Sequence, residues 1–427
     1  MKKIFSIIIS VAFSLIANAQ SPAPAAAQSS SILILGGTAH LGNGSVIENA
    51  AVAFDKGKIV FVGNASAVNK DQYSRTIDAK GKHIYPGLID CNTKIGITEI
   101  GAVRSTVDYA EVGSLNPNVR SIIAYNTDSK ITPTLRVNGI LLAQIVPEGD
   151  IISGQSSVVT MDGWNWEDAA YKTDEGIHMN WPRMYANNSS DKEKDEKQKE
   201  QMNKALDNIE QFFKEAKSYS KSSPTEKNVR MEAMKGLFDG SKKLYVHAGY
   251  IKQIESAVLF CKRYGIQMVL VDGYDSWRVA DLLKENNVPV ILLELHDLPP
   301  REDDDIDLRY KLPYLLKKAG VSFAISYPGS WQTRNLPYQA GTAVEYGLTK
   351  EEALMSITLS PAKILGIDKT AGSLEVGKDA ILFISSGDVL DMKTNNVELA
   401  FINGREINLD DMQKQLYRKY QQKYGLK

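Results

Sequence analysis

The residues of this chain that could do chemistry stand at the ends of apolar runs that read as buried strands. His247, Asp272 and Glu294 each close or follow such a run. An imidazole and two carboxylates at the carboxyl ends of neighbouring parallel strands meet at one edge of the sheet. Such a set can act as general acid and base, or can hold a divalent metal that activates water. We therefore predict His247, Asp272 and Glu294 as candidate catalytic residues.

A second group of side chains is predicted to line a pocket at the same edge. Cys91, Asn92 and Lys94 follow the apolar run at 83–89, and Tyr327 follows the run at 321–325. Clustered polar side chains at strand ends are typical of a pocket for a small molecule. The sequence thus favours a ligand site over a purely structural, apolar barrel mouth.

Lys94 and Cys91 each have two interpretations. An ammonium binds no metal and repels a bound cation, so Lys94 is interpreted as half of an internal ion pair with Asp90 or Asp272, or as reaching solvent. Cys91 could pair with His247 as thiol and imidazole, although a buried, inert thiol is favoured. Whether Cys91 and Cys261 form a disulfide stays open.

The other four histidines limit any metal-based chemistry, since the chain has only 5 in all. His40 and His83 fall near the turns of the first β-rich segment and are interpreted as structural. His178 follows a loop rich in Trp and acidic residues, for which aromatic packing is the favoured interpretation. His296 lies in a polar loop after Glu294.

Alternating strands and helices must position these residues. Buried-strand candidates recur between residues 83 and 325, and helix candidates follow several of them, which predicts a TIM (β/α)8-type barrel over residues 86–367. A helical insertion at about 187–238 carries apolar residues at helical spacing. It is interpreted as packed on the barrel exterior, with a lid or partner-binding arm as the alternative.

Both ends of the chain contain short strands that are too few to form separate sheets. Residues 31–85 and 368–410 are therefore predicted to form one small composite β-sandwich domain, with a hairpin turn at Asn403-Gly404. The fold class is α/β, and residues 411–427 are predicted to form a C-terminal helix.

The first residues read as a signal peptide. Lys2 and Lys3 precede an apolar run, and Ala17-Asn18-Ala19 is an A-x-A cleavage site, so residues 1–19 are predicted to be removed and residues 20–30 to form a disordered leader. We expect an exported protein, in a bacterial periplasm or secreted, with no membrane span after cleavage. The 50 basic and 51 acidic residues argue against a nucleic-acid partner.

Three motifs together resemble the amidohydrolase superfamily, and within it the exported imidazolonepropionase-like group. Tyr85-Pro86-Gly87-Leu88-Ile89-Asp90 is similar to the P-G-(L/F)-I-D of the family's first barrel strand. The other two motifs are Leu359-Ser360-Pro361-Ala362-Lys363-Ile364-Leu365-Gly366 and Gly372-Ser373-Leu374-Glu375-Val376-Gly377-Lys378-Asp379-Ala380, similar to a family helix and to its re-entry into the β domain. The resemblance implies a TIM barrel, a composite β-sandwich and metal-dependent hydrolysis of C–N bonds, often in cyclic amides.

The positions where the resemblance places metal ligands are mostly changed. Asn92 and Lys94 stand in place of the H-x-H pair, Asp272 in place of the strand-6 histidine and Tyr327 in place of the strand-8 aspartate. His247 is the only retained ligand position. We therefore expect no metal, with zinc as a cofactor only if the site is rebuilt.

The leading hypothesis is a non-catalytic protein that binds a small molecule in the barrel mouth, or that partners an active amidohydrolase homologue. The alternative is an active C–N hydrolase with a rearranged site around His247, Asp272 and Glu294.

Overall fold

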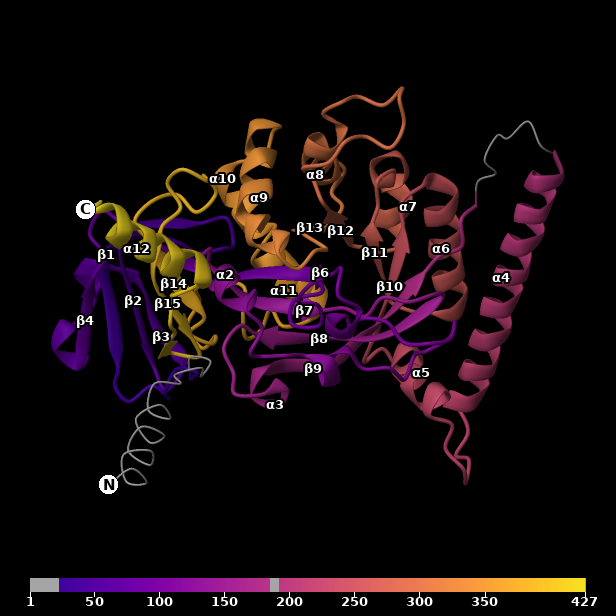
Figure 1. Cartoon of the computed structure of the whole chain (residues 1–427), viewed down its shortest axis with the longest axis horizontal. Helices are drawn as coiled ribbons and strands as arrows, with labels where there is room; N and C mark the ends of the chain where they lie inside the picture. The colour runs from indigo at the N-terminus through magenta and orange to yellow at the C-terminus, as the bar shows by residue number, and fades with distance from the viewer. Residues whose placement is uncertain (1–22, 185–191, 427) are drawn as a thin grey trace, which may run out of the picture.

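The computed structural model describes residues 23–184 and 192–426, so the predicted signal peptide lies outside the described residues. Two eight-stranded sheets organise this part of the chain. One sheet forms the composite domain at one end of the molecule, and the other forms the barrel in the middle (Figure 1). No helix of the described part is both long and apolar enough to cross a membrane.

The composite domain takes strands from both ends of the chain, as predicted. Its strand order is β16-β15-β14-β5-β1-β2-β3, with β4 paired to β1. The pairing of β5 with β14, which sets Tyr85 opposite Phe383, joins the two ends. The bounds are β1 (Ile32–His40), β2 (Val46–Asp55), β3 (Lys58–Asn64), β4 (Arg75–Asp78), β5 (His83–Pro86), β14 (Leu382–Ser385), β15 (Val397–Ile402) and β16 (Arg405–Glu406). Asn403 and Gly404 both have positive φ, as their predicted hairpin turn requires.

The barrel sheet has the order β13-β12-β11-β10-β9-β8-β7-β6 and confirms the predicted barrel. One strand differs from an all-parallel barrel: β8 runs antiparallel to both β7 and β9. The bounds are β6 (Leu88–Thr93), β7 (Ile140–Ile145), β8 (Ile152–Thr160), β9 (Ala170–Asn180), β10 (Lys243–Ala248), β11 (Met268–Asp272), β12 (Val290–Leu293) and β13 (Phe323–Ser326). Most of these side chains are buried, which is expected of strands covered on both faces.

Most of the helices lie beside the second half of the barrel, whereas α12 lies beside the composite domain (Figure 1). Their bounds are α2 (Thr132–Arg136), α3 (Trp166–Ala169), α4 (Lys192–Ser220), α5 (Val229–Asp239), α6 (Ile251–Tyr264), α7 (Ala280–Glu285), α8 (Leu308–Ala319), α9 (Leu336–Glu345), α10 (Lys350–Met355), α11 (Leu359–Leu365) and α12 (Met412–Tyr424). The helix α6 ends at Gly265 and α8 at Gly320, each in the left-handed conformation that a C-cap favours.

The helical insertion packs against the barrel exterior. Phe213 of α4 is fully buried, and its ring lies 4.9 Å from that of Phe260 in α6. These contacts favour the packed-helix interpretation of the apolar stripe.

The described part of the predicted leader makes specific hydrogen bonds. Ala25 N donates to Asp162 Oδ2 at 3.0 Å, and Gln28 contacts the backbone of Phe54 and Gly57. The prediction of disorder therefore does not hold for residues 23–30, because side chains of both domains supply partners for this backbone.

Gly87, in the first of the three motifs, stands where the chain passes from composite domain to barrel. A Cβ at this position would lie 2.7 Å from Ile381 Cγ2 and 3.0 Å from Leu141 Cβ. We expect Gly87→Ala to lower the free energy of unfolding by about 1–3 kcal/mol, through overpacking. Urea unfolding followed by circular dichroism measures this, with Gly101→Ala, whose Cβ would meet nothing within 4 Å, as the matched control. Equal stability of the two variants would contradict the prediction.

Candidate functional site

A cavity of about 390 Å³ opens at the barrel mouth. The polar side chains that line it include those of Asn92, Lys94, Glu148, Asn180 and His247. They come from the ends of β6, β9 and β10 and from the loop after β7, so the carboxyl ends of these parallel strands converge as the barrel fold requires. Three of the predicted residues, Asn92, Lys94 and His247, are thus brought together.

The end of β6 is fixed by the side chain of Asp90. Its Oδ1 accepts hydrogen bonds from Ser326 Oγ and Tyr327 N, both at 3.0 Å, and this joins β6 to the end of β13. Burial raises the pKa of the Asp90 carboxyl to about 8. Asp90 therefore closes the barrel and faces away from the cavity.

Asn92 lines the cavity in a strained conformation. Its φ is 58°, in the left-handed region, and its N–H donates to Gln144 Oε1 at 3.0 Å. The side-chain Oδ1 is buried and has no hydrogen-bond partner within the described part of the chain. A buried acceptor without a partner is costly unless a ligand or water supplies a donor.

Lys94 forms an ion pair with Glu148 inside the cavity. Its Nζ also lies 4.9 Å from the centre of the Tyr109 ring. The predicted pairing with Asp90 or Asp272 is wrong, because Asp90 is turned into the core and Glu148, on the neighbouring loop, lies closer. The side chain of Lys94 as a whole is 25% exposed.

His247 contacts a second histidine that the sequence analysis set aside. Its Nε2 lies 3.0 Å from Nδ1 of His178, whose ring stacks on Tyr245 at 4.6 Å. Burial, together with the charge of Lys94, lowers the pKa of His247 to about 4, and burial lowers that of His178 well below its usual value. Both rings are therefore neutral near pH 7.

His178 was missed because β9 was not predicted as a strand. The first half of β9 (Ala170–Asn180) is largely polar and lacks the apolar run by which the other barrel strands were predicted. The second half of β9 carries the features of a strand, since the residues from Gly176 to Met179 are buried as in a core strand.

Asp272 and Glu294 lie on another part of the rim. Burial raises the pKa of Asp272 to about 6, against the opposing charge of Arg309. Burial, together with the nearby Glu294 carboxylate, raises the pKa of Tyr327 to about 12. Within the described ranges, neither carboxylate nor Tyr327 is among the residues that line the cavity of His247.

Cys91 is fully buried, and burial raises the pKa of its thiol well above the usual value. It is not among the cavity residues, and His247 Nε2 is engaged by His178 instead. Cys91 and Cys261 are both free thiols, so the cysteines are separate and buried. The predicted place of Cys91 in the pocket is therefore wrong, because its side chain is covered by the core.

The donor set does not fit the divalent metal that the family resemblance implies. Across residues 23–184 and 192–426, no three His, Cys, Asp or Glu side chains are grouped to hold a metal ion. An ammonium occupies the cavity beside His247, and the Nε2 atom of that histidine already has a hydrogen-bond partner.

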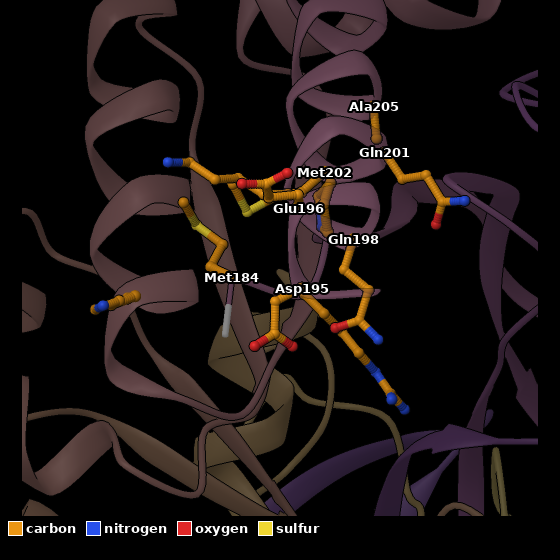
Figure 2. A pocket seen from close by; sticks show the side chains of 11 residues that line it. Met184, Asp195, Glu196, Gln198, Gln201, Met202 and Ala205 are labelled. Carbon is orange, nitrogen blue, oxygen red and sulfur yellow. The ribbon is translucent and has the colours of Figure 1, made fainter. Parts of the chain in front are cut away.

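A larger cavity, of about 770 Å³, lies between α4 and the segment after β9 (Figure 2). Met184, Met202 and Ala205 line it together with Glu196 and Gln198. It shares no lining residue with the barrel-mouth cavity, so we do not assign it to the site.

Known proteins share both the sequence pattern and this architecture. The amidohydrolase family profile matches residues 265–407. The chain is 26% identical to the imidazolonepropionase of Rhizobium rhizogenes over 373 residues, which cover 79% of this chain and 87% of that protein. An amidohydrolase from Thermotoga maritima superposes with a TM-score of 0.78 at 25% identity, covering 88% of this chain and 99% of that chain.

Residues 265–407 thus match the amidohydrolase family, and the chain as a whole is similar to amidohydrolases in sequence and in fold. Molinate hydrolase also shares this fold, since it superposes on the chain with a TM-score of 0.56 at 14% identity. The barrel and the composite domain are thus similar in fold to those of an amidohydrolase.

Proposed function

We propose that this amidohydrolase-superfamily protein binds a small polar molecule in the barrel mouth through its own side chains, without a resident metal and without hydrolysis by a metal-bound water. The observation that carries the proposal is the ammonium of Lys94, held by Glu148 inside the cavity that His247 lines. A fixed positive charge there supplies the attraction for an oxygen or anion that a metal would otherwise supply.

The alternative, a hydrolase rearranged around His247, Asp272 and Glu294, has less support. A general acid and base must reach the same substrate, and the two carboxylates are not among the residues of the His247 cavity. The binding proposal needs only the groups that already converge.

We expect Lys94→Met to weaken binding of 4-nitrophenolate, a small anionic probe, by about 30-fold. A hydrogen bond to a charged group contributes about 2 kcal/mol, and every 1.4 kcal/mol corresponds to a factor of ten in affinity. Equilibrium dialysis at about pH 8, where the probe is ionised, measures the dissociation constant.

The matched control is Lys58→Met, since Lys58 also pairs with a carboxylate, at 2.6 Å from Asp379, but lies in the composite domain. This control should bind the probe as the wild type does. Unchanged binding by Lys94→Met would contradict the proposal. So would stoichiometric zinc, manganese or iron in protein purified without added metal, if its removal abolished binding.

We further propose that the protein is exported through residues 1–19 to the periplasm or beyond, and that it serves as the non-catalytic partner of an active homologue. The sequence of the first residues supports export. Amino-terminal sequencing of protein from the producing cell should begin at Gln20, and a start at Met1 in the cytoplasmic fraction would contradict export.

A further inference from the structure

A chain of hydrogen bonds runs from the cavity into the barrel core. His247 Nε2 lies 3.0 Å from His178 Nδ1, and His178 Nε2 lies 3.0 Å from Ser156 Oγ. Ser156 Oγ then lies 2.5 Å from Glu175 Oε1. His178 and Ser156 are 0% exposed and Glu175 is 4% exposed. The chain thus links a cavity residue to a carboxyl group that solvent does not reach.

The partners of Glu175 fix the direction of these hydrogen bonds. Gln144 Nε2 donates to Oε1 at 2.5 Å, and the Tyr245 hydroxyl donates to Oε2 at 2.7 Å. When Glu175 is ionised, its carboxylate also accepts from Ser156, and Ser156 then accepts from Nε2–H of His178. His178 Nδ1 is then an acceptor, and His247 donates to it through Nε2–H. The other ring nitrogen of His247, Nδ1, is then unprotonated.

Every hydrogen bond of this chain can reverse when one proton enters from the cavity. The entering proton binds His247 Nδ1. The Nε2–H bond of the same ring then breaks, and its proton moves to His178 Nδ1. His178 Nε2–H then passes its proton to Ser156 Oγ, and the original hydroxyl proton of Ser156 moves to Glu175 Oε1. The result is a neutral Glu175 and two neutral imidazoles in their other tautomers, with one proton gained in all.

We propose that the barrel mouth takes up a weakly acidic small molecule, with an N–H or O–H group, as its anion, and that its proton passes through His247, His178 and Ser156 to Glu175. This inference rests on the proposed function and names its ligand class. The anion stays beside the ammonium of Lys94, so charge is conserved within the site. Asn92 lines the same cavity.

The surroundings of the chain suit a proton that is stored on Glu175. Burial raises the pKa of Glu175, while its three hydrogen-bond donors and the charge of Lys172 lower it. Lys242, Lys243, Tyr245 and Cys91 also interact with this carboxyl. At the other end, Lys94 disfavours a charged His247, so a proton does not rest there as imidazolium.

The test uses full-length protein with 15N-labelled histidine and 4-nitrophenol, whose anion absorbs visible light and whose neutral form does not. At about one pH unit below the probe's own pKa, wild type should produce the visible band in a saturable way. Imidazole 15N spectra should show His178 and His247 changing together from Nε2–H to Nδ1–H. Glu175→Gln should lose most of the band and keep both rings as Nε2–H.

Two further variants make the result decisive. Glu232→Gln is the matched control, because Glu232 also accepts from a tyrosine hydroxyl, Tyr219 at 2.8 Å, but lies on α5. It should behave as wild type. Tyr245→Phe removes one donor from Glu175 and should strengthen the band at lower pH, an effect that misfolding does not produce.

Each outcome separates this inference from the proposed function. If wild type and Glu175→Gln give the same visible band, or if the rings become imidazolium, the relay is wrong while the binding site stands. If wild type does not bind the probe at all, the proposed function fails and the inference fails with it.

Discussion

Replacing Asp162 with alanine should lower the free energy of unfolding by about 3–5 kcal/mol, because it leaves buried arginines without a counter-charge. Asp162 Oδ1 lies 3.0 Å from Arg136 Nη1, and Oδ2 lies 3.2 Å from Arg405 Nη1. The Arg136 and Asp162 side chains are only 10% and 4% exposed. Asp162 therefore ties the barrel, through Arg136, to the composite domain, through Arg405, and to the backbone of Ala25.

Urea unfolding followed by both fluorescence and circular dichroism measures the effect. The matched control is Glu406→Ala, which breaks an ion pair with Arg75 whose side chains are 46% and 38% exposed. This exposed pair should contribute less than about 1 kcal/mol. An Asp162→Ala variant no less stable than Glu406→Ala would show that the three-way contact is not what joins the domains.

Asp90→Ala should cost about 2–3 kcal/mol, because Tyr327 N–H and Ser326 Oγ both lose the acceptor that closes the barrel. Asp90→Asn keeps an oxygen acceptor, so it should be tolerated far better. Guanidinium unfolding of the two variants, compared at one pH, measures the difference. Equal losses would indicate that the carboxyl group acts through its volume and not through these hydrogen bonds.

The same residue predicts how stability depends on pH. Burial raises the pKa of Asp90 in the folded state to about 8, above the value of about 3.9 for an unfolded chain. Between these values the folded state binds the proton that the unfolded state has released, so the free energy of unfolding falls as pH rises from about 4 to about 8. Asp90→Asn should flatten this dependence, and an unchanged slope in that variant would assign it to other groups.

Patterns local in sequence predicted most of the fold. The hairpin at Asn403-Gly404 and the paired strands at both ends of the chain have turn residues and alternation that need no long-range information. The strand β9 was not predicted, because Lys172, Thr173 and Asp174 are polar. Its pairing with β8 and β10 holds it in the sheet, and that pairing is not visible in the local sequence. The antiparallel direction of β8 is equally a tertiary property, since an apolar run does not encode its direction.

The candidate site was predicted in part for the same reason. His247 and Lys94 could be placed at the barrel mouth because strand ends converge there. The partner of Lys94 could not, because Glu148 belongs to a loop whose path depends on β7 turning back into β8. The series of hydrogen bonds from His178 to Glu175 depends on which face of β9 points inward. A one-residue change of register would turn the opposite set of side chains inward.

The pairing of β5 with β14 has a consequence for how the chain is made. Tyr85 of β5 pairs with Phe383 of β14 in one sheet. That sheet is therefore complete only after β14, near the end of the chain, has been synthesised. Contacts of such sequence separation form slowly. The edge of β5 that β14 covers therefore stays unpaired until β14 has been synthesised, and an unpaired strand edge favours aggregation.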